Sequence, residues 1–368
     1  MKVLHISRSM GQGGAEKIVF QLCTGIKEVS QCVASAGGLY VNSLNNEHIK
    51  HYEIPDIDGK NPFTILKTLL LLCKIVKLEK VHIVHTHHRM AAFYARVLQF
   101  FNHRLKHVYT AHNVFYGKRL LLRFALQRAV VVAVGNGVKE NLKTEYGINE
   151  KRIRVIYNAI DTSELTGNNN ELIDSLKESG YYVIGSIGRL SRQKGIDVLI
   201  KAMRELNDEF NSIKLVIIGD GEDRNKLEKL AKRLGVTDKI IFLGYQSNVL
   251  DIISQLEFVV LPSRWEGLPL TPIETFSQGK TIIATNIPGN NEIIVNQKNG
   301  LLFKKDNVAD LVKKIKLLIL DNQLKRNLED SAYESYKNNY NYSVFLNGYK
   351  NVYKAVLGTK KYKTTNKL

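Results

Sequence analysis

Two carboxylates, Glu266 and Glu274, lie in the stretch from Pro262 to Gly279 and are separated by seven residues. Carboxylate oxygens accept hydrogen bonds in pairs, as binding of a sugar's hydroxyl groups requires. Backbone amides from Leu270 to Ile273 could face a diphosphate, apart from the proline among them, which has no N–H. The alternative is that Glu274 only caps a helix and Glu266 is a solvated loop acid.

The elements around this stretch place it at the edge of a parallel sheet. The apolar run Phe258 to Leu261 is typical of a buried strand. Thr271, Pro272 and Glu274 fit the N-cap, N1 and N3 positions of a capping box and predict a helix that begins at this point. We therefore expect the loop to lie where open α/β sheets bind ligands, beyond the carboxyl end of a strand.

Two cations follow another predicted strand, Tyr182 to Gly188. Arg189 and Lys194 lie in a loop bounded by glycines, before a helix that contains Val198, Leu199 and Met203. A guanidinium fork and an ammonium point charge could together offset the charge of a departing phosphate. The alternative is a surface loop closed by salt bridges.

Composition limits the class of protein. The chain has 368 residues and 44% hydrophobic content, which indicates two globular domains. Its three cysteines have no even or metal-like spacing, and its first residues show no signal-peptide pattern, so we expect a reduced, cytoplasmic protein. The apolar segment Thr64 to Leu78 is interrupted by lysines and is shorter than the roughly 20 residues of a spanning helix.

A one-sided basic region explains part of the formal charge of +18. Between Glu79 and Glu140 there is no acidic residue. The segment from 117 to 128 mixes bulky apolar residues with cations, as helices that lie on anionic membranes do. The cations expected at a membrane surface are Lys118, Arg119, Arg123 and Arg128. A packed helix with solvated arginines is the alternative; nucleic acid would also explain the charge, but the region carries no recognisable nucleic-acid motif.

The amino-terminal half predicts a ligand-binding edge of its own. A glycine loop from Arg8 to Glu16 follows the first strand and would let a ligand approach the backbone closely. It fails as a dinucleotide fingerprint, because Glu16 stands where the third glycine belongs. His112 also follows a strand, and we expect its side chain to point into the same ligand-binding cleft as the glycine loop. The alternative is an ordinary core or loop histidine.

Two further patterns suggest metal binding at first sight. The histidines at 85, 87 and 88 lie at a strand end, but no acid or cysteine accompanies them, so we expect no metal there. Asp56 and Asp58 spell the DxD pattern of metal-dependent sugar transferases. We interpret them as part of a loop before the helix that begins at Pro62.

The alternation of strands and helices predicts the domain organisation. Both halves show βαβ patterns and therefore parallel sheets. We expect an α/β protein with domains at residues 1–161 and 181–340, a polar linker at 162–180, and a final helix with a basic tail at 341–368.

The combination of four motifs resembles the family-4 retaining glycosyltransferases of the GT-B fold. The motifs are Gly13 to Glu16, Gly188 to Gly195, Gly219 to Glu222, and Glu266 to Glu274. The resemblance covers nearly the whole chain in the right order. It implies two Rossmann-like domains that face each other across a cleft, a nucleotide sugar held mainly by the second, and a last helix that returns to the first. Ala159 and Lys280 depart from residues that are frequent in the family, namely glycine and proline.

The resemblance also implies roles for individual residues. Arg189 and Lys194 would bind the donor diphosphate, Glu274 the ribose and Glu266 the transferred sugar, while His112 would touch that sugar. These imply a catalytic set of Arg189, Lys194, Glu266 and His112. The implied donor-binding residues are Gly13, Gly14, Gly188, Arg189, Lys194, Gly219, Glu266, Gly267, Leu268, Leu270, Thr271 and Glu274. No metal and no cofactor besides the nucleotide sugar are implied.

The predicted function is transfer of a sugar from a nucleoside diphosphate, with UDP favoured, to a lipid-linked or oligosaccharide acceptor. The resemblance also implies retention of configuration by a route in which the departing phosphate helps to deprotonate the acceptor, so that no protein nucleophile is needed. We expect a cytoplasmic enzyme, peripheral to the inner membrane face, in cell-surface polysaccharide biosynthesis. The alternatives are a GT-B-fold nucleotide-sugar epimerase and a basic nucleic-acid-binding protein.

Overall fold

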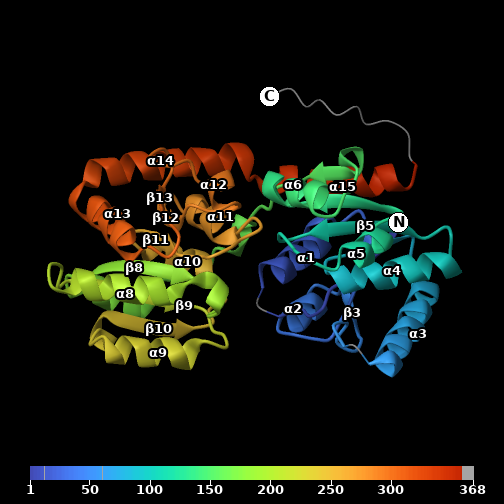
Figure 1. The fold of residues 1–368 in the computed structure, drawn as a ribbon, viewed down its shortest axis with the longest axis horizontal. Coiled ribbons are helices and arrows are strands. Elements are labelled where there is room, and N and C mark those ends of the chain that lie inside the picture. Colours follow the sequence, from blue (N-terminus) through green and yellow to red (C-terminus); the bar gives the residue numbers. More distant parts are fainter. Residues whose placement is uncertain (12, 60, 359–368) are drawn as a thin grey trace. The chain divides into compact units, whose positions relative to one another are not determined.

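The computed structural model describes residues 1–11, 13–59 and 61–358, so the predicted basic tail at 359–368 lies outside the described residues. The chain divides into two compact units. The first contains Met1–Asn158 and the chain from Ser343 onward, and the second is Ala159–Tyr342 (Figure 1). Each unit is an α/β structure with a parallel sheet of its own.

A seven-stranded sheet forms the centre of the first unit, in the order β3-β2-β1-β4-β5-β6-β7. All its neighbouring strands pair in parallel. The strands are β1 Lys2–Ile6, β2 Ser30–Ser35, β3 Lys50–Glu53, β4 Ile83–Thr86, β5 Lys106–Ala111, β6 Ala129–Ala133 and β7 Ile153–Val155. The helices are α1 Gly14–Gly25, α2 Tyr40–Asn46, α3 Pro62–Leu78, α4 Arg89–Phe101, α5 Arg119–Ala125, α6 Asn136–Thr144, the short 3₁₀ helix Glu150–Arg152, and α15 Tyr342–Val356.

The tyrosine-rich end of the chain packs into this first unit. Tyr349 and Tyr353 of α15 are fully buried. The hydroxyl of Tyr353 lies 2.8 Å from Nδ1 of His85 on β4, and that of Tyr349 lies 3.2 Å from the hydroxyl of Thr110 on β5. Buried tyrosines need such partners for their hydroxyl groups. These bonds therefore fix α15 to two central strands.

A six-stranded sheet forms the centre of the second unit, in the order β10-β9-β8-β11-β12-β13. The strands are β8 Tyr182–Ile187, β9 Ile213–Ile218, β10 Ile240–Gly244, β11 Val259–Leu261, β12 Ile282–Thr285 and β13 Leu301–Phe303. The α-helices are α7 Glu171–Glu178, α8 Ile196–Asn207, α9 Arg224–Arg233, α10 Val249–Gln255, α11 Leu270–Ser277, α12 Asn290–Ile293, α13 Val308–Leu320 and α14 Asn322–Asn339, and short 3₁₀ turns lie at Thr162–Glu164, Arg192–Lys194 and Thr237–Lys239.

Residues 162–180, expected as a linker, contain a 3₁₀ turn and helix α7 and group with the second unit. Side chains of α10 hold this segment. Both carboxylate oxygens of Asp251 accept hydrogen bonds from Thr166 and Gly167, and Gln255 accepts one from the amide of Asn170. Asp251 and Gln255 are both buried, so the polar composition of the segment reflects satisfied contacts.

Both sheets reverse their direction of growth at one place. In the first unit, β1 lies between β2 and β4, and in the second, β8 lies between β9 and β11. Ligands of open α/β sheets bind beyond the carboxyl ends of the strands at such a switch point. Ligand-binding loops are therefore expected after β1 and β4 in the first unit and after β8 and β11 in the second.

Among the described residues, no helix is both long enough and apolar enough to pass through a membrane.

Candidate active site

An ion pair joins the two loops at the switch point of the second unit. Nζ of Lys194, in the loop after β8, lies 2.6 Å from Oε1 of Glu266, in the loop after β11. Glu266 is only 6% exposed. Its oxygens also accept hydrogen bonds from the hydroxyl of Ser263 and from the amide of Gln193. Because an ammonium has three donors, Lys194 keeps donors for a further ligand.

Arg189 lies in the same loop but pairs with another acid. Its guanidinium donates two hydrogen bonds to Glu222, at 3.2 and 2.9 Å. This bonding lowers the pKa of the Glu222 carboxyl. Both side chains are more than half exposed, and exposed ion pairs contribute little to stability. An anionic ligand can therefore compete with Glu222 for the guanidinium.

Glycines bring the loops of the second unit into backbone contact. A Cβ atom on Gly219 would lie 2.2 Å from the carbonyl oxygen of Gly188, and one on Gly289 would lie 2.5 Å from that of Gly267. These separations leave no room for a side chain. At the carboxyl edge of the sheet, the loop after β9 therefore touches the loop after β8 at Gly219 and Gly188. In the same way, the loop after β12 touches the loop after β11 at Gly289 and Gly267.

The predicted capping box at the start of α11 is wrong. The helix begins at Leu270 with Pro269 at the N-cap, and no side chain caps it. Thr271 and Glu274 are therefore both inside the helix, and Pro272 occupies N3 in place of N1. The hydroxyl of Thr271 lies 3.5 Å from the carbonyl oxygen of Ile187 at the end of β8. Glu274 is buried in the second turn of the helix.

Arg264 is a residue of this edge that the sequence did not single out. Its guanidinium donates to Asp197 at 2.8 Å, to Asp306 at 2.7 Å and to the carbonyl oxygen of Arg192 at 2.9 Å. It thereby joins the loop after β11 to the one after β8. Nothing in the sequence around Arg264 indicated these partners, because they lie in distant segments of the chain.

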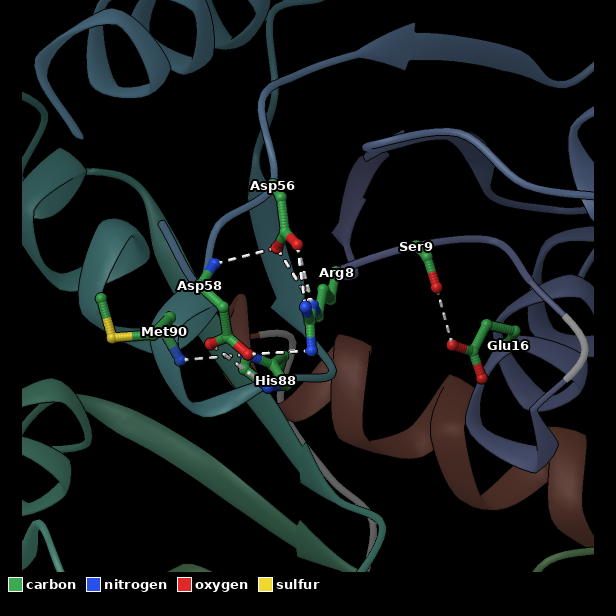
Figure 2. Close-up of polar contacts among 7 residues, drawn as sticks. All are labelled: Arg8, Ser9, Glu16, Asp56, Asp58, His88 and Met90. Atoms are coloured by element: carbon green, nitrogen blue, oxygen red, sulfur yellow. Dashed lines mark hydrogen bonds and ion pairs between the residues drawn. The ribbon is translucent and has the colours of Figure 1, made fainter. Parts of the chain in front are cut away.

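In the first unit, Arg8 in the loop after β1 binds the two aspartates of the DxD pattern, which lie between β3 and α3. Arg8 donates to Asp56 at 2.8 Å and pairs with Asp58 at 3.1 Å (Figure 2). Its hydrogen bond lowers the pKa of the Asp56 carboxyl. His88, the N-cap of α4, lies 3.8 Å from Asp58. Both carboxylates belong to the loop that precedes α3, and both are paired with the guanidinium of Arg8.

The glycines of the same loop lie at the start of α1. Gly13 is the N-cap residue and Gly14 the first residue of the helix. A Cβ atom on Gly13 would lie 2.1 Å from the carboxylate of Glu16, which accepts a hydrogen bond from Ser9 (Figure 2). The absence of a side chain at Gly13 therefore gives Glu16 the space to reach Ser9.

His112 ends a row of hydrogen-bonded histidines at the carboxyl edge of the first sheet. Its Nε2 lies 3.0 Å from Nδ1 of His87, whose Nε2 lies 3.0 Å from Nδ1 of His5. Burial lowers the pKa of His112 and of His5 to about 4, and that of His87 well below its ordinary value. All three rings are therefore neutral at pH 7.

Ring nitrogens of His5, His85 and His87 lie within 4.8 Å of one another, as ligands of a metal ion would. Hydrogen bonds account for the cluster. His5 and His87 bond to each other, and the two nitrogens of His85 face the hydroxyls of Tyr353 and Thr110 at 2.8 Å each.

Comparison with known proteins identifies the family. Residues 12–164 match the family described as Glycosyltransferase Family 4, and residues 168–335 match glycosyl transferases group 1. The chain belongs to the GT-B glycosyltransferases of the family-4 type. The expected fold is confirmed: two parallel-sheet Rossmann-like units, with GT-B glycosyltransferases as structural neighbours.

The names of two relatives of this glycosyltransferase include a lipid diphosphate as the substrate. It is 27% identical over 266 residues to the Escherichia coli UDP-Gal:α-D-GlcNAc-diphosphoundecaprenol α-1,3-galactosyltransferase, with coverage of 67% of this chain and 68% of the relative. It is 24% identical over 352 residues, covering 88% and 92%, to a Campylobacter jejuni N-acetylgalactosaminyltransferase whose named substrate is a diphospho-undecaprenol.

Solved structures of similar fold cover nearly the whole glycosyltransferase. A Rickettsia africae glycosyltransferase is 25% identical, with a TM-score of 0.82 and coverage of 98% of this chain and 99% of that one. Anabaena HepE, solved with UDP and glucose, has a TM-score of 0.85 at 20% identity, with coverage of 96% and 100%. The second similarity shows the fold alone.

The glycosyltransferase thus carries its predicted site residues on two units. Lys194 and Glu266 are in contact, and Gly188 lies against the Lys194 side chain, where an added Cβ would be 3.1 Å from Cε. The predicted donor-binding residues from 188 to 274 all belong to the second unit, whereas Gly13, Gly14 and His112 belong to the first.

The predicted membrane-surface cations lie on and beside α5. Lys118, Arg119, Arg123 and Arg128 are all exposed, while Leu122 and Ala125 of the same helix are buried. α5 thus combines a packed face with a basic one. This agrees with the alternative of a packed helix with solvated arginines, and binding of these cations to a membrane stays a prediction.

Proposed function

We propose that this glycosyltransferase moves a sugar from a nucleoside diphosphate, UDP in the first instance, to a lipid-linked or oligosaccharide acceptor. The reaction retains anomeric configuration, needs no metal ion and serves cell-surface polysaccharide biosynthesis. The observation that carries this proposal is the contact between Lys194 and Glu266 at the switch point of the second sheet. In this contact, a cation that can bind a phosphate lies beside a carboxylate that can accept hydrogen bonds from hydroxyl groups.

Charge stabilisation is the chemistry these groups can supply. As the bond between sugar and phosphate breaks, negative charge collects on the departing diphosphate. Lys194, whose side chain is mostly buried, offsets that charge with little reorganisation. Arg189 adds to it once the ligand replaces Glu222 as the partner of its guanidinium. Glu266 and Glu274 hold hydroxyl groups of the sugar and the ribose, and His112 and the glycine loop of Gly13 and Gly14 complete the donor-binding set.

The acceptor assignment is supported by the relatives and by the surface of the first unit. Two named relatives act on diphospho-undecaprenol compounds. The first unit exposes cations on α5, where Leu120 is 81% exposed, and it also exposes Phe101 at the end of α4, which is 76% exposed. Apolar and cationic side chains together are typical of surfaces that bind anionic membranes. We therefore place the enzyme at the inner membrane face, as a peripheral cytoplasmic protein.

A thermal-shift screen of nucleoside diphosphates and their sugars tests donor binding first. We expect UDP or a UDP-sugar to raise the melting temperature at saturating concentration, because a ligand that binds only the folded state stabilises it. A shift with oligonucleotides and with no nucleotide would instead support the nucleic-acid-binding alternative.

The reaction itself is tested with the donor that the screen identifies and an undecaprenyl-diphosphate sugar. NMR of the product should show the anomeric configuration of the donor, and turnover should persist in EDTA. Release of a free sugar without acceptor would support the epimerase alternative. An inverted product, or loss of turnover in EDTA that metal restores, would refute retention or metal independence.

A further inference from the structure

Gln31, at the inner end of the histidine row, has one possible orientation. The amide nitrogen lies 2.8 Å from the carbonyl oxygen of Leu22, 3.1 Å from that of Cys23 and 3.3 Å from that of Ile26. Its Oε1 lies 2.8 Å from Nε2 of His5. A flipped amide would place an oxygen against three carbonyl oxygens, so the NH₂ group must face them. The amide oxygen therefore faces His5 and can only accept.

This orientation fixes the proton on each ring in turn. Nε2 of His5 must donate to Gln31, so Nδ1 of neutral His5 accepts from Nε2–H of His87. Nδ1 of neutral His87 then accepts from Nε2–H of His112. Each ring has one proton to give, and each step leaves a single choice for the next. The proton of His112 is thus set by an amide that His112 does not touch.

The outer end of the row is left with a lone pair. Among the described residues, Nδ1 of His112 is buried and has no hydrogen-bond partner. In the order derived above, this nitrogen carries no proton. A buried acceptor without a donor costs free energy, which a ligand with a donor group would recover.

We propose that Gln31 is a positioning residue for the transfer reaction: through His5 and His87 it holds His112 with its proton on Nε2, so that Nδ1 accepts a hydrogen bond from the transferred sugar. The inference rests on the proposed function for the identity of the ligand, while the proton order depends on this first unit alone.

A restriction on the donor follows. The group that meets His112 must carry a hydrogen to donate, as a hydroxyl or an amide N–H does. A carboxylate or a fluorine at that position has no hydrogen to donate, so it would place its lone pairs against the lone pair of Nδ1 of His112. A site that hydrogen-bonds a hydroxyl discriminates strongly against analogues that lack one.

The proton positions can be measured by NMR of the full chain labelled with ¹⁵N-histidine at pH 7.5. We expect His5, His87 and His112 all to carry the proton on Nε2. In Gln31→Leu, the fixed acceptor is gone, and His112 should become a mixture of both neutral forms. The control is Gln99→Leu. Gln99 is also buried and donates to a backbone carbonyl, that of Leu105, but it lies on α4 and, among the described residues, has no hydrogen bond to any of the three histidines.

The control should keep the wild-type proton order whatever stability it loses. If wild-type His112 carries its proton on Nδ1, or if Gln31→Leu leaves His112 as in the wild type, the proposal is overturned. Should Gln31→Leu not fold, His5→Phe removes the link between Gln31 and His87 and must give the same mixture.

The link to the sugar is tested with deoxyfluoro analogues of the donor, one ring position at a time. At one position the wild type should lose about tenfold in kcat/KM, the value of one hydrogen bond, and Gln99→Leu should lose as much. In Gln31→Leu and His112→Ala that loss should shrink. An equal loss in all four proteins would overturn the role of Gln31. If no donor is turned over at all, the proposed function fails while the proton order still stands or falls by NMR.

Discussion

Gly195 and Pro262 are in backbone contact across the switch point of the second sheet: a Cβ atom on Gly195 would lie 2.2 Å from the carbonyl oxygen of Pro262. Gly195 follows Lys194, and Pro262 begins the loop that carries Glu266. The contact therefore fixes how closely the cation and the acid can approach. A side chain at Gly195 would push the two loops apart.

We predict that Gly195→Ala destabilises the protein far more than Gly235→Ala. Both glycines have a left-handed backbone, with φ of 64° and 69°, so both variants bear the same strain, about 1 kcal/mol. An added Cβ at Gly235 meets nothing within 4 Å. Urea unfolding should give a further loss of about 2 kcal/mol or more in Gly195→Ala, with weaker nucleotide binding. Equal stability of the two variants would show that the loops can separate without cost.

We predict that Lys194→Ala lowers donor turnover about 100-fold or more, because it removes a cation that faces the departing phosphate. Lys201→Ala is the control, since Lys201 on α8 is half exposed and pairs weakly with Asp197 at 3.9 Å. Steady-state kinetics with the donor, accompanied by urea unfolding, separates loss of chemistry from loss of fold. Turnover near the wild-type value in a folded Lys194→Ala protein would refute the assigned role.

Local signals in the sequence predict much of the fold. The structure begins α3 at Pro62, where the sequence predicts the start of a helix. Asn61 caps α3 through the amide of Phe63, directly before a proline at N1. The short strands β3 and β7, at the two edges of the sheet, were not predicted. The four residues of β3 are polar, and the three of β7 mix apolar and charged side chains, so neither has the apolar pattern of a buried strand.

Pairings between distant segments were not predictable. His5 and His85 are neighbours because β1 and β4 pair in that register, which the sequence does not display. The start of α11 depends on Pro269 and on the end of β8, where the hydroxyl of Thr271 finds an acceptor. The orientation of Gln31 likewise depends on three carbonyl groups at the end of α1.

Stability should fall steeply between pH 7 and pH 5. Burial lowers the pKa of His107 to about 3, of His5 and His112 to about 4, and of His85 and His87 well below 6.5. The unfolded chain binds protons near 6.5 that the folded chain does not, so stability is complete above 6.5 and is lost as pH falls toward 4.

Each buried histidine should lower the free energy of unfolding by about 1.4 kcal/mol per pH unit in this window. Five histidines amount to on the order of 7 kcal/mol at pH 5.5, which is a large part of an ordinary domain's stability. Urea unfolding from pH 7.5 to 5.5 measures the slope, and His107→Leu should reduce it by about one fifth. A flat profile in the wild type would contradict neutral, buried rings.

Charge removal on α5 should weaken binding to anionic membranes. Each cation near such a surface contributes about 1 kcal/mol, so Arg119→Ser with Arg123→Ser should lower partitioning into phosphatidylglycerol vesicles about 30-fold. The matched control removes Lys232 and Arg233, two exposed cations of α9 in the second unit. Flotation at two ionic strengths reports the difference, since an electrostatic attraction is screened by salt. Equal flotation of the two double variants would assign the attraction to overall charge, and absence of wild-type binding would remove the membrane proposal while leaving the transfer chemistry intact.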